Sequence, residues 1–389
     1  FIHKIYYIVI LGFWFNMKLL NKYTYLFIGI LALVLIAVFT IIPRFQTQEF
    51  DPDRVIEISE GVTTTTATQS PENNNQTNQK PPTTSEISEI EKTEIEKLLL
   101  NNKAELIIDN YKTYLLIGSD ERDENSSSSR GYVDGQRADV IIVGLIDKNS
   151  NNHHLLSIPR DTLIINSCTK DLERINGSYS KNDCGNKAEN LAAAVTGITG
   201  IKVEHFASFN FEGFENIIDS FEGIEICVDE TQREGYSFEL QKGCQTVNGS
   251  TALNWVVSRN TEILVGEKIL DENGEDASAW VKMSGVSDLS RNERQQYVIL
   301  QLLRRLNDFT SLADLNNFVN ALEDSFIVDE NLTLNSAINT LWNLRGTNFD
   351  NINKLSIPTS PYELRDGRQV LIVSKNFTEY AKEVGLLDS

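Results

Sequence analysis

The sequence predicts an α/β sandwich that follows a single apolar N-terminal segment. Continuous apolar runs of strand length occur at residues 113–118, 139–146 and 154–158. Such runs are typical of strands that are covered on both faces, because a half-exposed strand alternates apolar with polar residues. Strand and helix patterns then alternate along the chain, which indicates a sheet with helices packed against it.

The N-terminal part contains a candidate membrane span. Residues 23–42 are twenty residues without a charged side chain, long enough to cross the hydrocarbon core of a bilayer. Lys18 and Lys22 precede this run, and Asp51 and Asp53 follow it. The positive-inside rule therefore places the N-terminus in the cytoplasm and the chain after residue 43 outside. A buried helix would need an amphipathic face, and a cleaved signal peptide would need a small-residue cleavage site; neither pattern is present.

The segments on either side of this span differ in composition. We expect Met17 to be the natural start and residues 1–16 to be translated upstream sequence, or else a second short apolar segment, so that 1–22 forms a short cytoplasmic N-terminus. Residues 43–103 are expected to link the membrane to the folded part. Within this linker, residues 59–85 consist mainly of Thr, Asn, Gln and Pro. Such a stretch cannot bury enough apolar surface to offset its ordering entropy, so we expect it to be a disordered tether.

The folded part is expected to comprise a main domain over residues 104–308. Residues 309–389 should form a C-terminal α/β extension, which is either a small second unit or an edge of the first. The further strands are predicted at residues 203–209, 224–228, 355–357 and 370–373. The helices are predicted at residues 86–100, 189–199, 212–221, 249–259, 289–306 and 378–386, with further helical sequence over 309–345.

The charge of the chain argues against nucleic-acid binding. The net charge is −20, from 35 basic and 55 acidic residues. All the acidic residues lie after residue 48, where 31 bases leave a net charge of −24. Nucleic-acid binders gain their affinity from a basic face that neutralises phosphates. An acidic chain can still hold a local cationic pocket.

The cysteines fit an external location. None of Cys168, Cys184, Cys227 and Cys244 has the CxxC spacing of a zinc or thioredoxin-like site. Four cysteines allow three pairings, of which we expect the nearest-neighbour one, 168–184 with 227–244. Each disulfide would close a loop of about 15 residues and contribute about 3 kcal/mol in the chain-entropy model. The alternative is four free buried thiols.

Acidic and basic residues stand at the ends of the first three strands. Asp120 and Arg160 follow the first and third strands, and Asp139 starts the second. Ligands of open α/β sheets bind at strand ends. Asp120 and Asp139 would meet only if their strands run antiparallel, and the pair would then suit Mg²⁺, which prefers carboxylates together with substrate phosphate. The alternative for each single residue is a turn residue or a surface ion pair.

A second set of polar residues opens the long helix. Asp288, Arg291 and Gln295 are spaced i, i+3 and i+7 and so share one helix face, with Arg294 beside them. Arg259 ends the preceding helix. Guanidinium groups near a helix N-terminus suit an anion such as phosphate, although a solvated helix face is the alternative. These residues together predict an external, membrane-tethered domain with a pocket for Mg²⁺ and a polyphosphate.

The order of these blocks resembles the LytR-CpsA-Psr family, over about Lys112–Asn307. The matching blocks are Leu115–Arg122 (LLIGSDER), Arg137-Ala-Asp139, Leu156–Asp161 (LSIPRD), Arg174-Ile-Asn176, Ala252-Leu253 with Ser258-Arg259, and Asp288–Gln296 (DLSRNERQQ). The resemblance implies a bacterial phosphotransferase that moves a glycopolymer, such as teichoic acid, capsule or arabinogalactan, from a polyprenyl-pyrophosphate carrier to peptidoglycan. It also implies an α-β-α sandwich with a mixed central sheet and an apolar groove for the prenyl chain.

The resemblance assigns roles by position. Asp120 and Asp139 would bind Mg²⁺, with Mn²⁺ as the alternative ion. The pyrophosphate would be held by Arg122, Arg160, Arg259, Arg291, Arg294 and Gln295. The residues that act on the transferred phosphoryl group would be Arg122, Arg160 and Arg291, with Asp288 orienting the arginines. Metal and arginines would stabilise the charge that spreads over this group.

The chain departs from the family pattern in three places. The family usually has Arg-x-Arg where this chain has Val257-Ser258-Arg259, so one arginine is missing. Residues 262–287 form a long insert between Arg259 and Asp288, and Lys268 or Lys282 in this insert is a candidate replacement for the missing charge. Arg174 replaces the usual lysine and keeps its charge. The general base is not identified, and Asp161 is a candidate.

Three other functions are considered, two of them from the same residues and one from the older family name. A polyprenyl-pyrophosphate phosphohydrolase would share the pocket and differ only in its acceptor. A non-catalytic binder of lipid-linked glycans would fit the valine at position 257. A transcriptional regulator, which the older family name suggests, is disfavoured by the external charge and the membrane span.

Overall fold

The computed structural model describes residues 46–60, 89–102, 104, 110–120, 137–149, 152–180, 184–283 and 288–387. All of them belong to the larger of the two units into which the chain divides, residues 45–389. The predicted membrane span at 23–42 and most of the predicted tether at 59–85 lie outside the described residues. Among the helices that are described, none is both long enough and apolar enough to cross a membrane.

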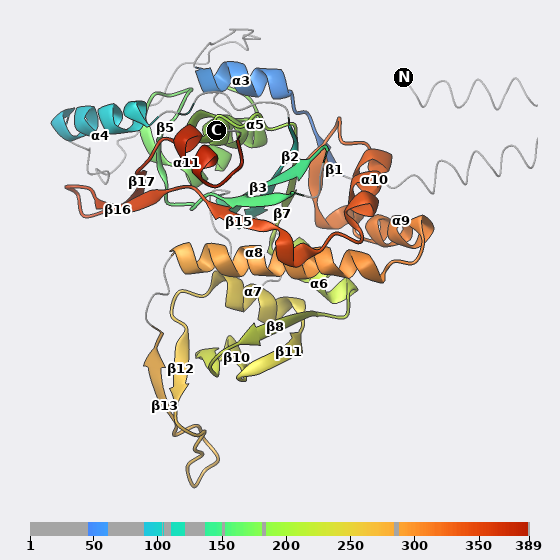
Figure 1. Cartoon of the computed structure of the whole chain (residues 1–389). Helices are drawn as coiled ribbons and strands as arrows, with labels where there is room; N and C mark the ends of the chain where they lie inside the picture. Colours follow the sequence, from blue (N-terminus) through green and yellow to red (C-terminus); the bar gives the residue numbers. More distant parts are fainter. Residues whose placement is uncertain are drawn as a thin grey trace, which may run out of the picture. The chain divides into compact units, whose positions relative to one another are not determined.

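A mixed seven-stranded sheet forms the centre of this unit (Figure 1). Its strands, in spatial order, are β1 (Gln46–Gln48), β14 (Ile327–Asp329), β7 (His205–Phe209), β2 (Tyr111–Ser119), β3 (Ala138–Asp147), β4 (His154–Ser157) and β15 (Asn353–Ser356). The pairs β2–β3, β3–β4 and β14–β7 are antiparallel. The pairs β2–β7, β4–β15 and β1–β14 are parallel.

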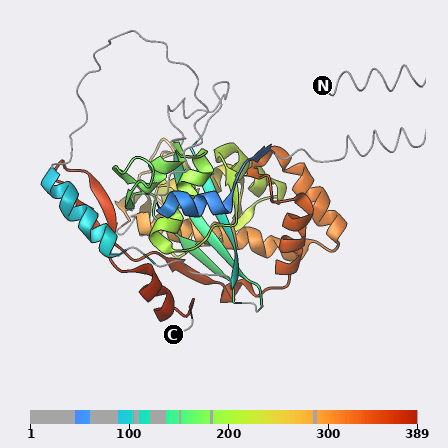
Figure 2. The ribbon, with the colours of Figure 1, turned by 90° about the horizontal axis from the view of Figure 1, so that it is seen from above.

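Helices cover both faces of the sheet, as the continuous apolar runs predict. Leu115 and Ile117 of β2 are buried with α5, whereas Ile142 of β3 and Leu155 of β4 are buried with α8, α9 and α10. The helices of the first face are α3 (Pro52–Glu60), α5 (Lys187–Thr199) and α11 (Phe377–Glu383). Those of the second are α8 (Asp288–Arg305), α9 (Leu312–Ala321) and α10 (Leu334–Leu344). The view from above in Figure 2 shows α3 crossing over the strands.

The C-terminal 81 residues do not form a separate unit but belong with the rest of residues 45–389 to one compact unit. β14 and β15, which come from this segment, pair with β7 and β4 of the central sheet. α11 joins the core on the α5 face. Of the two alternatives that the sequence left open, the structure shows an edge of the first unit.

The predicted linker also contributes to the fold. β1 extends the sheet beside β14, and Val55 and Ile58 of α3 are buried against α5. The next helix, α4 (Glu89–Asn101), buries Ile95 with Leu163, Leu364 and Val370. The parts of 43–103 that the structure describes are therefore packed on the domain.

A smaller layer lies on the far side of α8 from the sheet (Figure 1). α6 (Phe211–Ser220) and α7 (Gly249–Val257) share a core with the antiparallel pair β8 (Ile224–Val228) and β11 (Gly243–Val247). The insert at 262–287 contains a hairpin of β12 (Glu262–Val265) and β13 (Ala279–Lys282), which continues a sheet with β9 (Gln232–Glu234) and β10 (Phe238–Leu240). The remaining strands form the pairs β5 (Leu163–Ile165) with β6 (Leu172–Arg174), and β16 (Thr359–Glu363) with β17 (Gln369–Val373).

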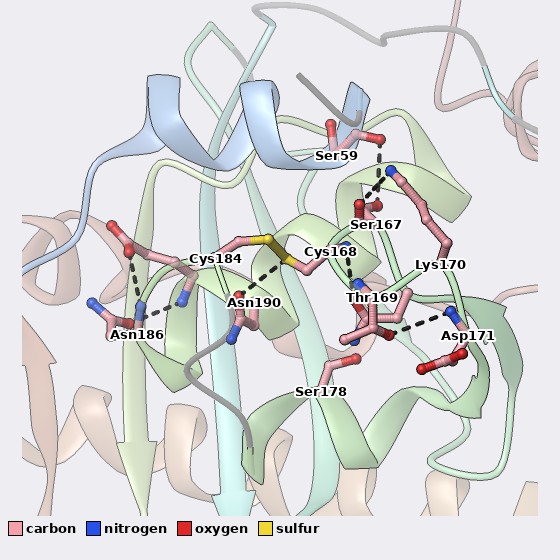
Figure 3. The surroundings of a disulfide bond; sticks show 12 residues. Ser59, Ser167, Cys168, Thr169, Lys170, Asp171, Ser178, Cys184, Asn186 and Asn190 are labelled. Carbon is pink, nitrogen blue, oxygen red and sulfur yellow. Dashed lines mark hydrogen bonds between the residues drawn. A yellow bond between two sulfur atoms is a disulfide. The ribbon is translucent and has the colours of Figure 1, made fainter. Parts of the chain in front are cut away.

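The cysteines pair as the sequence predicts. Cys227 and Cys244 are cross-strand partners on β8 and β11. Cys168 and Cys184 join the loop after β5 to the segment before α5 (Figure 3). That segment continues into Asn186, whose side chain caps α5 by accepting hydrogen bonds from the amides of Ala188 and Glu189. This disulfide therefore fixes the chain at the point where α5 begins.

Replacing both Cys168 and Cys184 by serine should lower the free energy of unfolding by about 3 kcal/mol, because the lost bond closes a loop of 16 residues in the unfolded chain. Urea unfolding followed by circular dichroism measures the difference. A reductant should lower the midpoint of the wild type more than that of the double variant, since the variant retains only the second disulfide. Equal midpoints for the oxidised wild type and the variant would contradict the prediction.

Candidate functional site: an arginine-lined cleft at the end of the sheet

The antiparallel pairing of β2 and β3 brings the two predicted metal ligands to the same end of the sheet. Gly118 pairs with Val140, and Ser119 pairs with Ala138 after a register shift. Asp120 continues this contact: its amide donates to the carbonyl of Arg137 at 3.2 Å, and its Oδ1 accepts from the Arg137 amide at 2.8 Å. The strands are antiparallel, which is the arrangement that Asp120 and Asp139 need in order to lie close together.

The electrostatics of Asp120 show that a second carboxylate is near. Burial raises the pKa of Asp120, and the negative charge of Asp139 raises it further. The Arg137 amide opposes both effects. A divalent cation between the two carboxylates would remove their repulsion, so this pair fits Mg²⁺ by its oxygen chemistry.

Arg160 lies directly beside Asp139. It follows β4 after Pro159, and its Nη1 donates to Asp139 Oδ1. Its Nε is 3.6 Å from Asp161 Oδ2, and only 15% of its side chain is exposed. Asp161 in turn lies 3.1 Å from Nη1 of Arg174. Because two guanidinium groups neutralise the Asp161 carboxylate, its geometry supports holding arginines in place rather than acting as a general base.

α8 supplies two further side chains of the predicted set. Arg291 is only 6% exposed, and its pKa is lowered to about 10, first by burial and then by the positive charge of Arg160. It therefore remains charged at neutral pH. Gln295, one turn later, points its Nε2 at the Asp139 carbonyl at 3.5 Å. The i, i+4 spacing of these residues places both on the helix face toward the sheet end.

These residues line one cleft of about 110 Å³ together with apolar side chains. We call its main polar residues the polar wall: Asp139, Arg160, Arg259, Arg291 and Gln295. We call its apolar residues the apolar wall: Val140, Phe209, Phe211, Phe214, Leu253, Val256 and Val257. Three guanidinium groups in one cleft with aromatic and aliphatic side chains suit a ligand that carries an anionic group on an apolar chain.

The apolar wall depends on a glycine at the strand end. A Cβ added at Gly118 would lie 2.8 Å from Val140 Cβ and 3.3 Å from a ring carbon of Phe209. Phe209 stacks on Phe214 with their ring centroids 6.1 Å apart. The family resemblance implied an apolar groove without naming its residues; the closely spaced aromatic residues at 209, 211 and 214 are the signal that could have located it.

Four predicted residues are not placed in this cleft. Arg122 lies outside the described residues, and only the backbone of Asp288 is described, as the first residue of α8. Asp120 lies at the sheet end beside the cleft without lining it. Arg294 is directed elsewhere: its Nη1 donates to the carbonyl of Trp255 and to Thr261 Oγ1. The prediction that Arg294 lies with Arg291 and Gln295 is therefore wrong for this structure.

The candidate replacements for the missing arginine are also wrong. Lys268 pairs with Glu239 at 2.5 Å, and Lys282 donates to Asn260 Oδ1 at 3.0 Å. Neither lines the cleft, whereas the Val257 side chain does. The structure therefore places an apolar residue where the family pattern has an arginine.

A family model decides which family this architecture represents. The model of the LytR_cpsA_psr family matches residues 61–266 and 257–384, more than half of the chain. This chain belongs to the LytR_cpsA_psr family. The membership agrees with the order of the Asp and Arg blocks and with the mixed sheet.

Relatives in this family are distant in sequence. The cell wall biosynthesis protein LcpA of Corynebacterium glutamicum is 26% identical over 270 residues, which are 60% of this chain and 48% of LcpA. The polyisoprenyl-teichoic acid–peptidoglycan teichoic acid transferases TagV and TagU of Bacillus subtilis are 24% and 26% identical, over 58% and 59% of this chain and 52% and 62% of their own lengths. The chain thus spans about half the length of the first relatives that it matches.

Solved structures of the family share the fold. B. subtilis TagV superposes with a TM-score of 0.54 at 21% identity, over 72% of this chain and 96% of TagV. The LytR-Csp2A-Psr enzyme of Actinomyces oris gives a TM-score of 0.52 at 22% identity, over 73% of this chain and 96% of that enzyme. TagT bound to LIIa-WTA gives 0.51 at 17% identity, over 72% and 92%. The α/β fold with a mixed central sheet, expected from the resemblance, is confirmed.

Proposed function

We propose that this protein is a Mg²⁺-dependent phosphotransferase that moves a glycopolymer from a polyprenyl-pyrophosphate carrier to peptidoglycan. The observation that carries the proposal is the cleft with two walls. Its arginines suit a pyrophosphate, and its aromatic and aliphatic wall suits the first isoprene units of a carrier lipid. A soluble sugar nucleotide would leave the apolar wall without a partner.

The relatives support the same substrate class. TagU and TagV are named as transferases that attach teichoic acid from a polyisoprenyl carrier to peptidoglycan. TagT has been solved bound to LIIa-WTA. We extend these activities to this chain because its cleft holds Arg160, Arg259, Arg291 and Gln295 at the positions of the family blocks.

The proposed reaction is a phosphoryl substitution. A hydroxyl oxygen of the acceptor sugar forms a bond to the glycan-linked phosphorus, and the bond from this phosphorus to the bridging oxygen breaks. The products are a phosphodiester between glycan and peptidoglycan, and polyprenyl phosphate; the hydroxyl proton passes to a base or to solvent. The guanidinium groups of Arg160 and Arg291 would stabilise the charge that develops on the phosphoryl and bridging oxygens.

The metal of this proposal would be held by Asp120 and Asp139. Burial and, to a lesser extent, the charge of Asp139 raise the pKa of Asp120, which fits a site that is completed by a cation. Bound Mg²⁺ would neutralise charge on the pyrophosphate oxygens. Arg160 donates to Oδ1 of Asp139, so this carboxylate would serve both the guanidinium and the ion.

We further propose that residues 23–42 anchor the chain in the cytoplasmic membrane with the folded unit outside. The uncharged run is long enough to span, and two disulfides in the folded unit suit an oxidising environment. A membrane anchor would also bring the cleft close to a lipid-linked substrate.

The test uses the full chain in detergent with a polyprenyl-pyrophosphate-linked oligosaccharide, Mg²⁺ and peptidoglycan fragments. Mass spectrometry should detect a phosphodiester-linked conjugate, together with polyprenyl phosphate. Release of polyprenyl phosphate without a conjugate would identify a phosphohydrolase instead. Substrate that binds and stays intact would identify a non-catalytic binder.

Replacing Val257 by arginine should tighten binding of a short prenyl pyrophosphate by about tenfold. Val257 lines the cleft, so the new guanidinium can reach the same anion as Arg259, and a charged hydrogen bond contributes about 1.5 kcal/mol or more. Isothermal titration with farnesyl pyrophosphate measures the change. Val257→Met is the matched control, because it lengthens the side chain without charge. Equal affinities for the two variants would show that charge at position 257 does not reach the ligand.

A further inference from the structure

Arg294 is a motif arginine that makes no contact with the cleft. It is 7% exposed, and its guanidinium lies 5.2 Å from the ring centroid of Trp255. Nη1 donates to the Trp255 carbonyl at 2.9 Å and to Thr261 Oγ1 at 3.1 Å. Nη2 lies 3.9 Å from Met283 Sδ. We call these contacts the Arg294 bridge.

The Arg294 bridge joins three elements. Trp255 belongs to α7, Thr261 precedes β12, and Met283 follows β13, so the last two form the base of the insert hairpin. The amide of Met283 donates to the Thr261 carbonyl at 2.8 Å. Arg294 itself lies in α8, and the bridge therefore connects α8 to the end of α7 and to the hairpin.

The segment that this bridge encloses contains Arg259. Between α7 and β12 the chain makes a turn in which Ser258 Oγ and Thr261 Oγ1 are 2.7 Å apart, and both residues are almost completely buried. Arg259 lies in this turn, is exposed, and lines the cleft. Its backbone is fixed by neighbours on both sides, of which Thr261 is held directly by Arg294.

Within the part of the chain that the structure describes, hydrogen bonds rather than an ion pair hold the guanidinium of Arg294. Burial lowers the pKa of Arg294, and the more remote Glu234 opposes this effect. A buried charge without an ionic partner costs free energy, so its hydrogen bonds must offset that cost. The planar fork of arginine holds Nη1 at the two oxygen acceptors and Nη2 at the Met283 sulfur at the same time, whereas a lysine ammonium offers a single nitrogen on a flexible stem.

We propose that Arg294 is a positioning residue, which fixes the 258–261 turn and thereby holds Arg259 at the cleft. The inference rests on the proposed function, since it assigns Arg259 to pyrophosphate binding. The inference goes beyond the proposed function because it gives the two arginines of the α8 motif different roles. Arg291 faces the ligand, whereas Arg294 positions Arg259, which also faces the ligand.

A double-mutant cycle tests the inference. Farnesyl pyrophosphate binding, with Mg²⁺, is measured by titration calorimetry on the full chain in detergent for wild type, Arg259→Ala, Arg294→Gln and the double variant. Each single variant should bind about tenfold more weakly, and the double variant should bind no more weakly than either single one. Independent roles would instead multiply the losses to about a hundredfold, and that result would overturn the inference.

Three further variants keep the result interpretable. Arg294→Lys should bind as weakly as Arg294→Gln; full recovery with lysine would show that charge alone matters and would overturn the inference. Thr261→Val removes an acceptor of the bridge while Arg294 remains, and it should weaken binding about threefold with no further loss when Arg259→Ala is added. Arg304→Gln, on the same helix but paired with the exposed Asp350, should change nothing.

The same data separate this inference from the proposed function. A wild type that binds farnesyl pyrophosphate and shows additive losses would overturn only the positioning role. A wild type that does not bind it at all would remove the proposed function and this inference together.

Discussion

Arg160→Ala is expected to lower the transfer rate by at least about a hundredfold. Arg160 lines the cleft and also binds Asp139, one of the two proposed Mg²⁺ ligands. Loss of one donor that stabilises developing charge costs about 10²–10³ in rate. Here the loss also leaves Asp139 without its ionic partner, which should disturb the proposed Mg²⁺ site. The measurement is the initial rate of conjugate formation under saturating Mg²⁺.

Arg160→Lys is the informative second variant. It keeps the positive charge but not the planar group, so it should recover the pairing with Asp139 only in part and remain at least about tenfold below wild type. Arg304→Ala, which removes an exposed arginine of α8, is the matched control and should retain wild-type rate. Transfer by Arg160→Ala at more than half the wild-type rate would exclude this arginine from the phosphoryl site.

The local part of the fold could be predicted from the sequence, because three neighbouring strands of the sheet, β2, β3 and β4, contain continuous apolar runs. β2, β3 and β4 were predicted to within two residues of their ends. The edge strand β1 and its neighbour β14 were not predicted, since strands of only three residues (QTQ and IVD) carry no periodic signal. The pairing of β14 with β7 joins residues more than a hundred positions apart, and no local pattern encodes such a contact.

The candidate site could be predicted as a set of residue types but not as a geometry. Helical periodicity places Arg291 and Gln295 within about 40° of each other, and Arg294 about 60° away on the other side. This difference in angle around α8 decides whether an arginine faces the sheet end or the end of α7. The sequence contains nothing that fixes how the helix is rotated. Packing against Trp255 does, because the ring and the Trp255 carbonyl provide a surface and an acceptor for Arg294.

Asp120→Asn is expected to raise the Mg²⁺ concentration for half-maximal transfer by at least tenfold and to lower the rate about a hundredfold at limiting Mg²⁺. The amide keeps an oxygen that can accept from the Arg137 amide, so the turn after β2 should survive the substitution. What the variant loses is a full negative charge beside Asp139, and hard divalent cations depend on such charges. Removal of Mg²⁺ with EDTA should abolish transfer by the wild type, and excess Mg²⁺ should restore it.

Asp161→Asn tests whether Asp161 binds the metal ion or instead holds arginine side chains in place. Asp161 contacts Arg160 and Arg174, so its loss should weaken prenyl-pyrophosphate binding while the Mg²⁺ concentration for half-maximal transfer stays unchanged. Asp120 and Asp161 have similar sequence positions, because Asp120 directly follows β2 and Asp161 follows β4 after Pro159 and Arg160. Their substitutions are nevertheless expected to have different effects on the Mg²⁺ requirement. An Asp120→Asn variant with an unchanged Mg²⁺ requirement would place the ion elsewhere. If Asp161→Asn changed the Mg²⁺ requirement instead, the cation would bind at Asp161, beside Arg160 and Arg174. Asp120 would then only stabilise the turn after β2.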